Sequence, residues 1–386
     1  MQLLFLCEGD AEQPHGSFSG SSHSIVSHLR LAGHTVRPVD VDLYGPRRWL
    51  AAAATFSPDR RRWSVRYHLD AVPFRLRSGL AASAIRRAGN AVDAVLQVGA
   101  TFAAAPVAGR PVFLYCDSNI RMAERGAESG QSHAASLGPD EVEAVAAREA
   151  EVYRSAAGVF AISERLRRSF IEDFGLAPER VHAVHAGPNF PAPIPPPAPR
   201  PEARAPTVLF VGVRFERKGG DLLLRAFAKV KERLPQARLL VIGPRTLAVR
   251  QDGVECLGFL RKDVPSEWAR LVEAYRQADV FCLPTRYEPF GIVFLEAMCF
   301  GLPCVGPAAW AVPEMVVDGE TGFLVPPEDV DALARRLVQV LENPELARRL
   351  GEAGRARAER HFTWPAVIGR MTAVMESVLA SRAGSG

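Results

Sequence analysis

Short apolar runs alternate with longer, helix-compatible segments along the whole chain, and this alternation constrains the fold more than any other feature. Such runs are typical of buried parallel strands, and the segments between them leave room for the crossover helices that parallel strands require. In the first half the runs are Leu3–Cys7, Val36–Val41, Val95–Val98, Val112–Cys116, Gly158–Ile162 and Val181–Val184. In the second half they are Val208–Gly212, Leu239–Gly243, Val254–Leu257, Val280–Leu283, Pro303–Gly306 and Gly322–Val325. The pattern predicts an α/β fold with one parallel sheet in each half.

A stretch dominated by proline and alanine separates the two halves, from Pro188 to Pro206. Proline fixes φ and lacks a backbone donor, so this stretch cannot join a sheet and is predicted to be a stiff linker. A chain of 386 residues is also too long for one typical core. We therefore expect an N-terminal Rossmann-like domain at 1–190, a linker at 191–206, a C-terminal Rossmann-like domain at 207–370, and a C-terminal helix at 371–386.

Two glutamates with seven residues between them, Glu288 and Glu296, lie at a predicted strand-to-helix junction. In open α/β sheets, ligands bind at the carboxyl ends of the strands, which is where this junction falls. A carboxylate on the loop can accept hydrogen bonds from sugar hydroxyls, and one on the helix can accept them from a ribose. The alternative for an isolated pair is two solvated charges around an ordinary loop.

The turn between the two glutamates leads directly into the helix. Phe290, Gly291 and Ile292 form the end of this turn and the first helical position. Because the first N–H groups of a helix have no partner within the helix, they favour an anion such as a phosphate. This turn is therefore predicted to contact a phosphate group.

A loop with glycines and basic residues follows the first strand of the second half, starting at Gly212. Glycines let the backbone turn sharply and approach a ligand. A departing nucleoside diphosphate needs its negative charge neutralised, which Arg217 and Lys218 can do in a closed site without a metal ion. In the first half, Asp117 follows the strand 113–116 and is a candidate for binding a sugar or acceptor hydroxyl, or alternatively for capping a helix.

These motifs resemble those of the retaining glycosyltransferases of family 4, the glycosyl transferases group 1. The resemblance is carried by 285–305, by Lys218-Gly219 and by 312–325, and it covers nearly all of 205–330. It implies the GT-B architecture, in which two Rossmann-like domains face each other across a cleft. In that architecture the C-terminal helix at 371–386 would cross back to the first domain. The first domain resembles the family only in outline.

The resemblance also implies roles for individual residues. Glu288 would hold donor-sugar hydroxyls, Glu296 would bind the ribose, and Lys218 would neutralise the diphosphate together with an arginine. The base would be bound mainly through the backbone of Gly258, Phe259 and Leu260, and Gly20 would approach the donor phosphates.

The chain departs from the family pattern at two places. Many relatives have arginine directly after the first glycine of the phosphate loop, where this chain has Val213. The role of that arginine therefore falls to either Arg214 or Arg217. Many relatives also place two glycines before 312–325, where this chain has Trp310 and Ala311, which predicts a differently shaped loop.

The expected function is retaining transfer of a hexosyl unit from a nucleotide-diphosphate sugar to a hydroxyl acceptor on a glycan, a lipid or a small molecule. Among donors a UDP-sugar is favoured and GDP-mannose is next. No metal ion and no cofactor beyond the sugar nucleotide are expected. The alternatives are a sugar-nucleotide epimerase or a phosphorylase on the same fold, and a catalytically silent GT-B subunit that binds a partner.

The formal net charge of +4 is modest but unevenly distributed. Between Arg47 and Arg87 there are ten arginines and only two aspartates, with tryptophan and phenylalanine interleaved. This composition suits an anionic partner such as a membrane surface, or it is an ordinary solvated face. Nucleic acid is not expected, because no binding motif accompanies the charge. Scattered cysteines and the lack of a signal-peptide pattern predict a cytoplasmic protein, with peripheral membrane contact as the variant.

Overall fold

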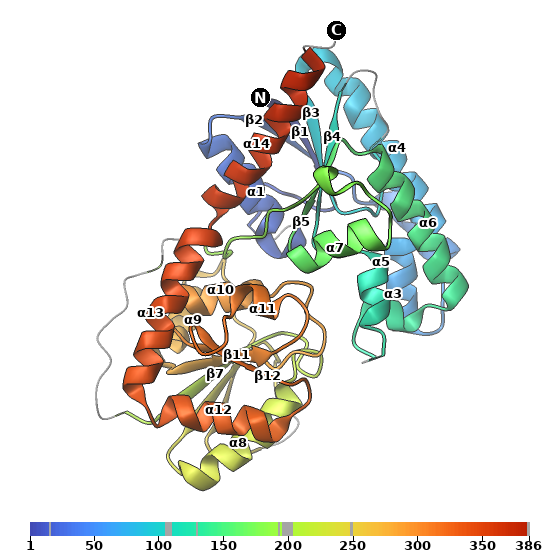
Figure 1. The fold of residues 1–386 in the computed structure, drawn as a ribbon. Helices are drawn as coiled ribbons and strands as arrows, with labels where there is room; N and C mark the ends of the chain where they lie inside the picture. Colours follow the sequence, from blue (N-terminus) through green and yellow to red (C-terminus); the bar gives the residue numbers. More distant parts are fainter. Residues whose placement is uncertain are drawn as a thin grey trace. The chain divides into compact units, whose positions relative to one another are not determined.

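The chain forms two compact units, Met1–Ala186 with Trp364–Gly386, and Gly187–Thr363 (Figure 1). The computed structural model describes residues 1–14, 17–104, 110–128, 130–191, 194, 204–247 and 250–383. Most of the expected linker at 191–206 lies outside these residues, so its stiffness stays a prediction. The C-terminal helix starts at Trp364 and belongs to the first unit over its whole length.

The first unit contains a six-stranded sheet of parallel strands in the order β2-β1-β3-β4-β5-β6. The strands are β1 (Gln2–Cys7), β2 (Thr35–Asp40), β3 (Ala94–Val98), β4 (Val112–Cys116), β5 (Gly158–Ala161) and β6 (Val181–Ala183). All residues of β3, β4 and β5 are buried, because helices cover both faces of a parallel sheet. All six predicted apolar runs of the first half are therefore confirmed as strands.

The helices of the first unit are α1 (Ser21–Leu31), α2 (Gly45–Ala54), α3 (Arg60–Leu69), α4 (Ala71–Ala88), α5 (Ile120–Arg125), α6 (Pro139–Ser155), α7 (Glu164–Glu172) and α14 (Trp364–Ala383). Helix α14 packs on α1 (Figure 1), and Arg370 on α14 donates to the carbonyl oxygen of Val184 at 2.7 Å. Among the described residues, no helix is both long and apolar enough to cross a membrane.

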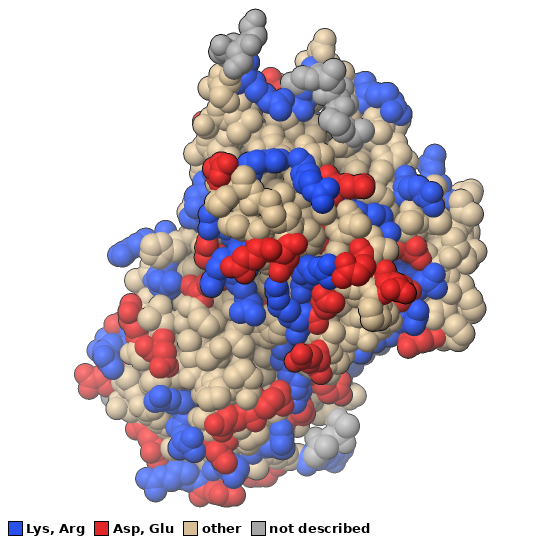
Figure 2. Space-filling view, turned by 45° about the vertical axis from the view of Figure 1, so that its right-hand side comes forward, with Lys and Arg blue, Asp and Glu red and all other residues tan. Residues whose placement is uncertain are grey.

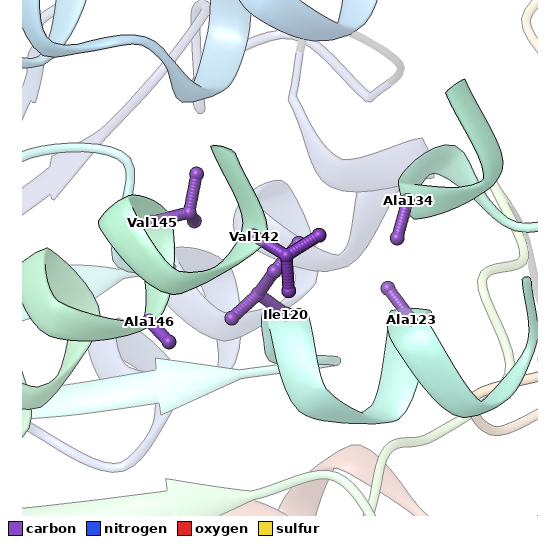
Figure 3. Packing of buried hydrophobic residues seen from close by; sticks show 6 residues of the cluster. All are labelled: Ile120, Ala123, Ala134, Val142, Val145 and Ala146. Atoms are coloured by element: carbon purple, nitrogen blue, oxygen red, sulfur yellow. The ribbon is translucent and has the colours of Figure 1, made fainter. Parts of the chain in front are cut away.

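A small apolar cluster lies behind the loop after β4. Its members are Ile120, Ala123, Ala134, Val142, Val145 and Ala146. In Figure 3, Ile120 of α5 lies against Val142 of α6, and Ala123 faces Ala134 of the short 3-10 helix His133–Ser136. The cluster thereby fixes α5, the helix that follows Asp117.

The second unit repeats the parallel arrangement, in the order β12-β11-β10-β7-β8-β9. Its strands are β7 (Thr207–Val211), β8 (Arg238–Ile242), β9 (Val254–Gly258), β10 (Val280–Cys282), β11 (Cys304–Pro307) and β12 (Gly322–Val325). Its helices are α8 (Gly220–Arg233), α9 (Pro265–Gln277), α10 (Ile292–Cys299), α11 (Val312–Met315), α12 (Val330–Leu341) and α13 (Pro344–His361). The six predicted runs of the second half are confirmed as well.

The strand order of the second sheet reverses between β7 and β10. From β7 the chain continues outward through β8 and β9, and then crosses to β10 on the other side of β7. In sheets of this kind, the crevice at such a switch point receives the ligand, outside the carboxyl ends of the two strands. The loops after β7 and β10 therefore lie where a ligand is expected to bind.

Candidate active site

The loops after β7 and β10 bring Lys218 and Glu288 into direct contact. The Nζ atom of Lys218 donates to Oε2 of Glu288, across 70 residues of sequence. Both residues are buried. The two side chains meet beside the switch point of the second sheet, so two of the predicted site residues are brought together where the topology favours ligand binding.

The electrostatics of the pair follow from its burial. Loss of hydration lowers the pKa of Lys218, and the carboxylate of Glu288 offsets this effect only in part. A buried lysine paired with one carboxylate has ammonium hydrogens left for a second acceptor. The arrangement can therefore hold an anionic group next to Glu288.

The β7 loop, which carries Lys218, can approach the β10 loop only because position 219 is glycine. Gly219 has φ of +74° and precedes helix α8, and a Cβ atom there would collide with the carbonyl oxygen of Pro284. Gly212 packs against the side chain of Lys218, and a Cβ atom at Gly212 would lie 2.9 Å from Cγ of that lysine. Gly219 thus permits the close approach of the β7 and β10 loops, and Gly212 leaves room for the side chain of Lys218.

Glu296 forms a second pair with a lysine that the sequence analysis did not connect to it. Nζ of Lys262 donates to Oε1 of Glu296 and also to the carbonyl oxygen of Asn189 at 2.9 Å. The hydroxyl of Tyr275 donates to Oε2 of Glu296 at 3.4 Å. Burial keeps the pKa of Tyr275 far above its usual value, so that its hydroxyl remains a donor. Glu296 is therefore a buried, ionically paired carboxylate on α10.

The turn that starts α10 has the geometry expected for an anion site. Gly291 has φ of +108° and directly precedes the helix. A Cβ atom on Gly291 would lie 2.9 Å from a ring carbon of Phe294 and 3.2 Å from Cγ of Glu288, so the turn is closely packed. Phe290 is buried, and Ile292 is half-buried at the first helical position. The turn thus presents the N-terminus of α10 beside Glu288.

The predicted base-binding segment lies at the end of β9. Gly258 has φ of +77°, and its carbonyl oxygen accepts from the N–H of Gly243 at 3.0 Å. The Phe259 side chain is exposed and Leu260 is buried. A stacking surface for a planar group is available at Phe259.

Arg214 and Arg217 differ in their surroundings. Arg214 is exposed, whereas Arg217 is half-buried and its carbonyl oxygen accepts from the N–H of Arg286 at 3.0 Å. The Nε atom of Arg217 is buried and has no hydrogen-bond partner among the described residues. Both arginines lower the pKa of Lys218, and Arg217 has the larger effect, so Arg217 is the arginine whose charge acts more strongly on the buried pair.

Arg286 joins the two loops and was missed in the sequence. Its guanidinium binds Asp221 of α8 at 2.6 and 2.8 Å and Glu328 at 2.9 Å. These carboxylates raise its pKa further above the usual range. The residue belongs to the recognised motif, but its partners lie 65 and 42 residues away, so only the fold reveals the connection.

Trp310 takes a backbone conformation that usually belongs to glycine, with φ of +58°. Its indole N–H donates to the carbonyl oxygen of Arg286 at 2.8 Å, and its ring meets Tyr287 edge-on with centroids 5.0 Å apart. The loop before α11 therefore has a left-handed residue that is not glycine, and its side chain is fixed by these two contacts.

The first unit has its own polar groups at the carboxyl edge of its sheet. Burial raises the pKa of Asp117 to about 6. Gly20, with φ of +94°, precedes α1. The sequence analysis missed Glu8, which follows β1 and pairs with the fully buried Arg77 at 2.9 Å and with the hydroxyl of Thr101. Burial acts to raise the pKa of Glu8, but His68, Arg77 and Thr101 together hold this pKa below its usual value, with His68 contributing the most.

Comparison with known proteins places this geometry in a family. Residues 197–357 match the model of the glycosyl transferases group 1. The MMP alpha-(1->4)-mannosyltransferase of Mycolicibacterium hassiacum is 31% identical over 239 residues, which are 59% of this chain and 56% of that protein. A GDP-mannose-dependent alpha-(1-6)-phosphatidylinositol monomannoside mannosyltransferase of Mycolicibacterium smegmatis is 33% identical over 191 residues, 43% of this chain and 50% of that protein. The chain spans about half the length of the curated relatives it matches.

The similarity in fold extends further than the similarity in sequence. Sucrose-phosphate synthase from Thermosynechococcus elongatus superimposes with a TM-score of 0.73 over 99% of this chain and 100% of its own, at 21% identity. The two parallel six-stranded sheets are thus those of a GT-B protein, as the motifs predict. The second unit of this chain belongs to the glycosyl transferases group 1, and the whole chain has the GT-B fold.

Proposed function

We propose that the protein is a retaining glycosyltransferase that moves a hexosyl unit from a nucleotide-diphosphate sugar to a hydroxyl acceptor. The observation that carries this proposal is the buried Lys218–Glu288 pair at the switch point of the second sheet. The pair puts a cation for the diphosphate beside a carboxylate for sugar hydroxyls. Retention rests on the resemblance of the 285–305 segment to the family.

GDP-mannose is the donor that the relatives favour. The relatives named above are mannosyltransferases, and one of them is named as GDP-mannose-dependent. They give no support to the UDP-sugar preference drawn from the sequence. The exposed ring of Phe259 at the end of β9 suits stacking of a purine or a pyrimidine, so it does not discriminate between the two bases.

The donor would be bound by residues of the second unit. Lys218 and Arg217 would neutralise the diphosphate, Glu288 would hold sugar hydroxyls, and Glu296 would accept from the ribose. In this arrangement Lys262 would hold the carboxylate of Glu296 in position. We propose no metal ion or further cofactor for the reaction.

A lipid-linked hydroxyl is the acceptor class that the relatives favour, because one of them is named for a phosphatidylinositol monomannoside. Asp117 in the first unit is the residue proposed to meet a hydroxyl group. Peripheral contact of a cytoplasmic protein with an anionic membrane accords with such an acceptor. No nucleic-acid partner is proposed.

A panel of GDP-, UDP- and ADP-sugars tests the proposal, with nucleotide binding and nucleotide release measured for each. Changing Glu296 to alanine should weaken nucleotide binding by about 1–3 kcal/mol, because a buried hydrogen bond to the ribose is lost. Changing Glu288 to alanine should lower turnover more than nucleotide affinity. The matched control is Glu320→Ala, an exposed glutamate of the same unit. Unchanged kinetics and affinity in both variants would falsify the assignment.

Other outcomes separate the alternatives. Binding of sugar nucleotides without any release would favour a catalytically silent subunit. Conversion of the sugar without an acceptor would favour an epimerase, and phosphate-dependent release of a sugar phosphate would favour a phosphorylase.

A further inference from the structure

One short segment of the first unit exposes most of its large apolar side chains. The exposed fractions are 61% for Tyr44, 77% for Trp49, 57% for Leu50 and 62% for Phe56. On helix α2, positions 46, 49, 50 and 53 lie on one face, and all four are exposed. Ala51 is the one residue of helix α2 that is buried. Such an apolar face on a surface helix needs a partner that covers it.

The segment is held firmly despite its exposure. The indole N–H of Trp63 on α3 donates to the carbonyl oxygen of Ala52 at 3.0 Å, and the Trp63 ring meets Phe56 edge-on at 5.6 Å. The hydroxyl of Tyr44 donates to Asp40 at 2.6 Å. The exposed apolar side chains therefore lie on a backbone that these contacts hold in place. Binding of a partner to them would need little further ordering of the segment.

The arginines of this region fall into two groups. Arg61 donates to the carbonyl oxygens of Gly130 and Ser132, and Arg62 pairs with Glu141 at 2.9 Å. These two hold α3 to the rest of the unit. By contrast, Arg47 and Arg48 on α2 are exposed and form no ion pair with any described residue. Figure 2 shows, on the face it displays, that basic side chains are interspersed with acidic ones.

From these observations we propose that the 44–56 segment is a docking surface for an anionic lipid bilayer. Tryptophan, leucine and phenylalanine would enter the interfacial region, and Arg47 and Arg48 would meet the phosphate groups of the lipids. This inference deepens the proposed function, since it names the surface on which a lipid-linked acceptor would be approached. It also restricts the membrane contact predicted for the arginine-rich region 47–87 to helix α2 and the turns beside it.

Cosedimentation of the full chain with vesicles tests the proposal. We expect binding at low salt to vesicles of phosphatidylcholine mixed with phosphatidylglycerol, weak binding to phosphatidylcholine alone, and loss of binding at high salt. The double variant Arg47→Ser, Arg48→Ser should bind about 25-fold more weakly, at about fivefold for each arginine. The double variant Trp49→Ser, Leu50→Ser should lose at least about tenfold.

Matched controls lie elsewhere on the same unit. Leu31 on α1 is 81% exposed, so Leu31→Ser removes an apolar side chain without touching α2. Arg86 and Arg87 are exposed at the far end of α4, so their change to serine removes equal charge. Both controls should bind vesicles as the parent protein does. Equal loss in the controls, equal binding to neutral vesicles, or no sedimentation at low salt would each overturn the proposal.

Binding of GDP-mannose, measured without vesicles, separates this inference from the proposed function. All of the variants should retain it, because the changed residues lie outside the second unit. A parent protein that binds GDP-mannose but not vesicles would refute the docking surface alone. A parent protein that binds vesicles but no sugar nucleotide would refute the proposed function.

Discussion

Changing Glu149 to glutamine should stabilise the first unit at alkaline pH and leave it unchanged at acidic pH. Glu149 is buried on α6, and its Oε2 atom accepts from the N–H of Ile120 at 2.9 Å. This bond ties α6 to the start of α5, directly after Asp117 and its neighbours. Burial raises the pKa of Glu149 to about 7, against the lowering effect of that hydrogen bond.

The magnitude follows from the displacement of the pKa. The ordinary value is 4.5, so the difference is about two and a half pKa units, and at about 1.36 kcal/mol for each unit the ceiling is about 3 kcal/mol. Because burial raises the pKa of this acid, folding favours its protonated form. The stability that the protonated form provides is fully present below the ordinary pKa of 4.5. It is lost as the pH rises through about 7, where the folded protein must bury a charge.

Glutamine has the shape of the protonated acid, keeps a carbonyl oxygen for the N–H of Ile120, and never ionises. The variant should therefore gain up to about 3 kcal/mol over the parent protein near pH 8, and almost nothing near pH 4. Hydrogen–deuterium exchange of peptides from α5 and α6, at both pH values, reports on this unit separately from the other one. The control is Glu151→Gln, an exposed glutamate on the same helix. A variant that is destabilised at both pH values, or equally stabilised at both, would contradict the reasoning.

Two further predictions concern the second unit. Gly219→Ala should abolish most of the transferase activity and destabilise the unit by at least about 1–3 kcal/mol, because Cβ would strike the carbonyl oxygen of Pro284. Gly319→Ala is its control, since φ is +73° there and nothing lies within 4 Å, and urea denaturation compares the two. Turnover should also survive EDTA, because Arg217 and Lys218 supply positive charge for the diphosphate. Activity that EDTA abolishes and that magnesium or manganese restores would contradict this expectation.

The sheets could be predicted from the sequence because a strand buried on both faces needs apolar residues in nearly every position. A reader of the sequence therefore finds the strands without knowing their order. The junction at Glu288 could also be recognised, since the motif is continuous in the chain. The Lys218–Glu288 contact was harder to predict from the sequence, because it depends on β7 and β10 being neighbours in the sheet.

Other contacts could not be foreseen for the same reason. Lys262 reaches Glu296 across 34 residues, and the Glu8–Arg77 pair joins the loop after β1 to the middle of α4. No local pattern marks either pair, since lysine and arginine are common on helices and loops. Only the strand order and the register of the sheets bring such charges together, and burial then makes the pairing obligatory.

At position 310, where many relatives have glycine, this chain has a tryptophan in a left-handed backbone conformation. A left-handed conformation costs a residue other than glycine about 1–2 kcal/mol. The hydrogen bond from the Trp310 indole to the carbonyl oxygen of Arg286 returns about 0.5–1.5 kcal/mol, and the edge-on contact with Tyr287 returns a similar amount. Those contacts offset the strain, and both lie on the loop that carries Glu288. Trp310 thus holds a φ of +58°, which glycine would adopt at little cost, and the differently shaped loop stays a prediction.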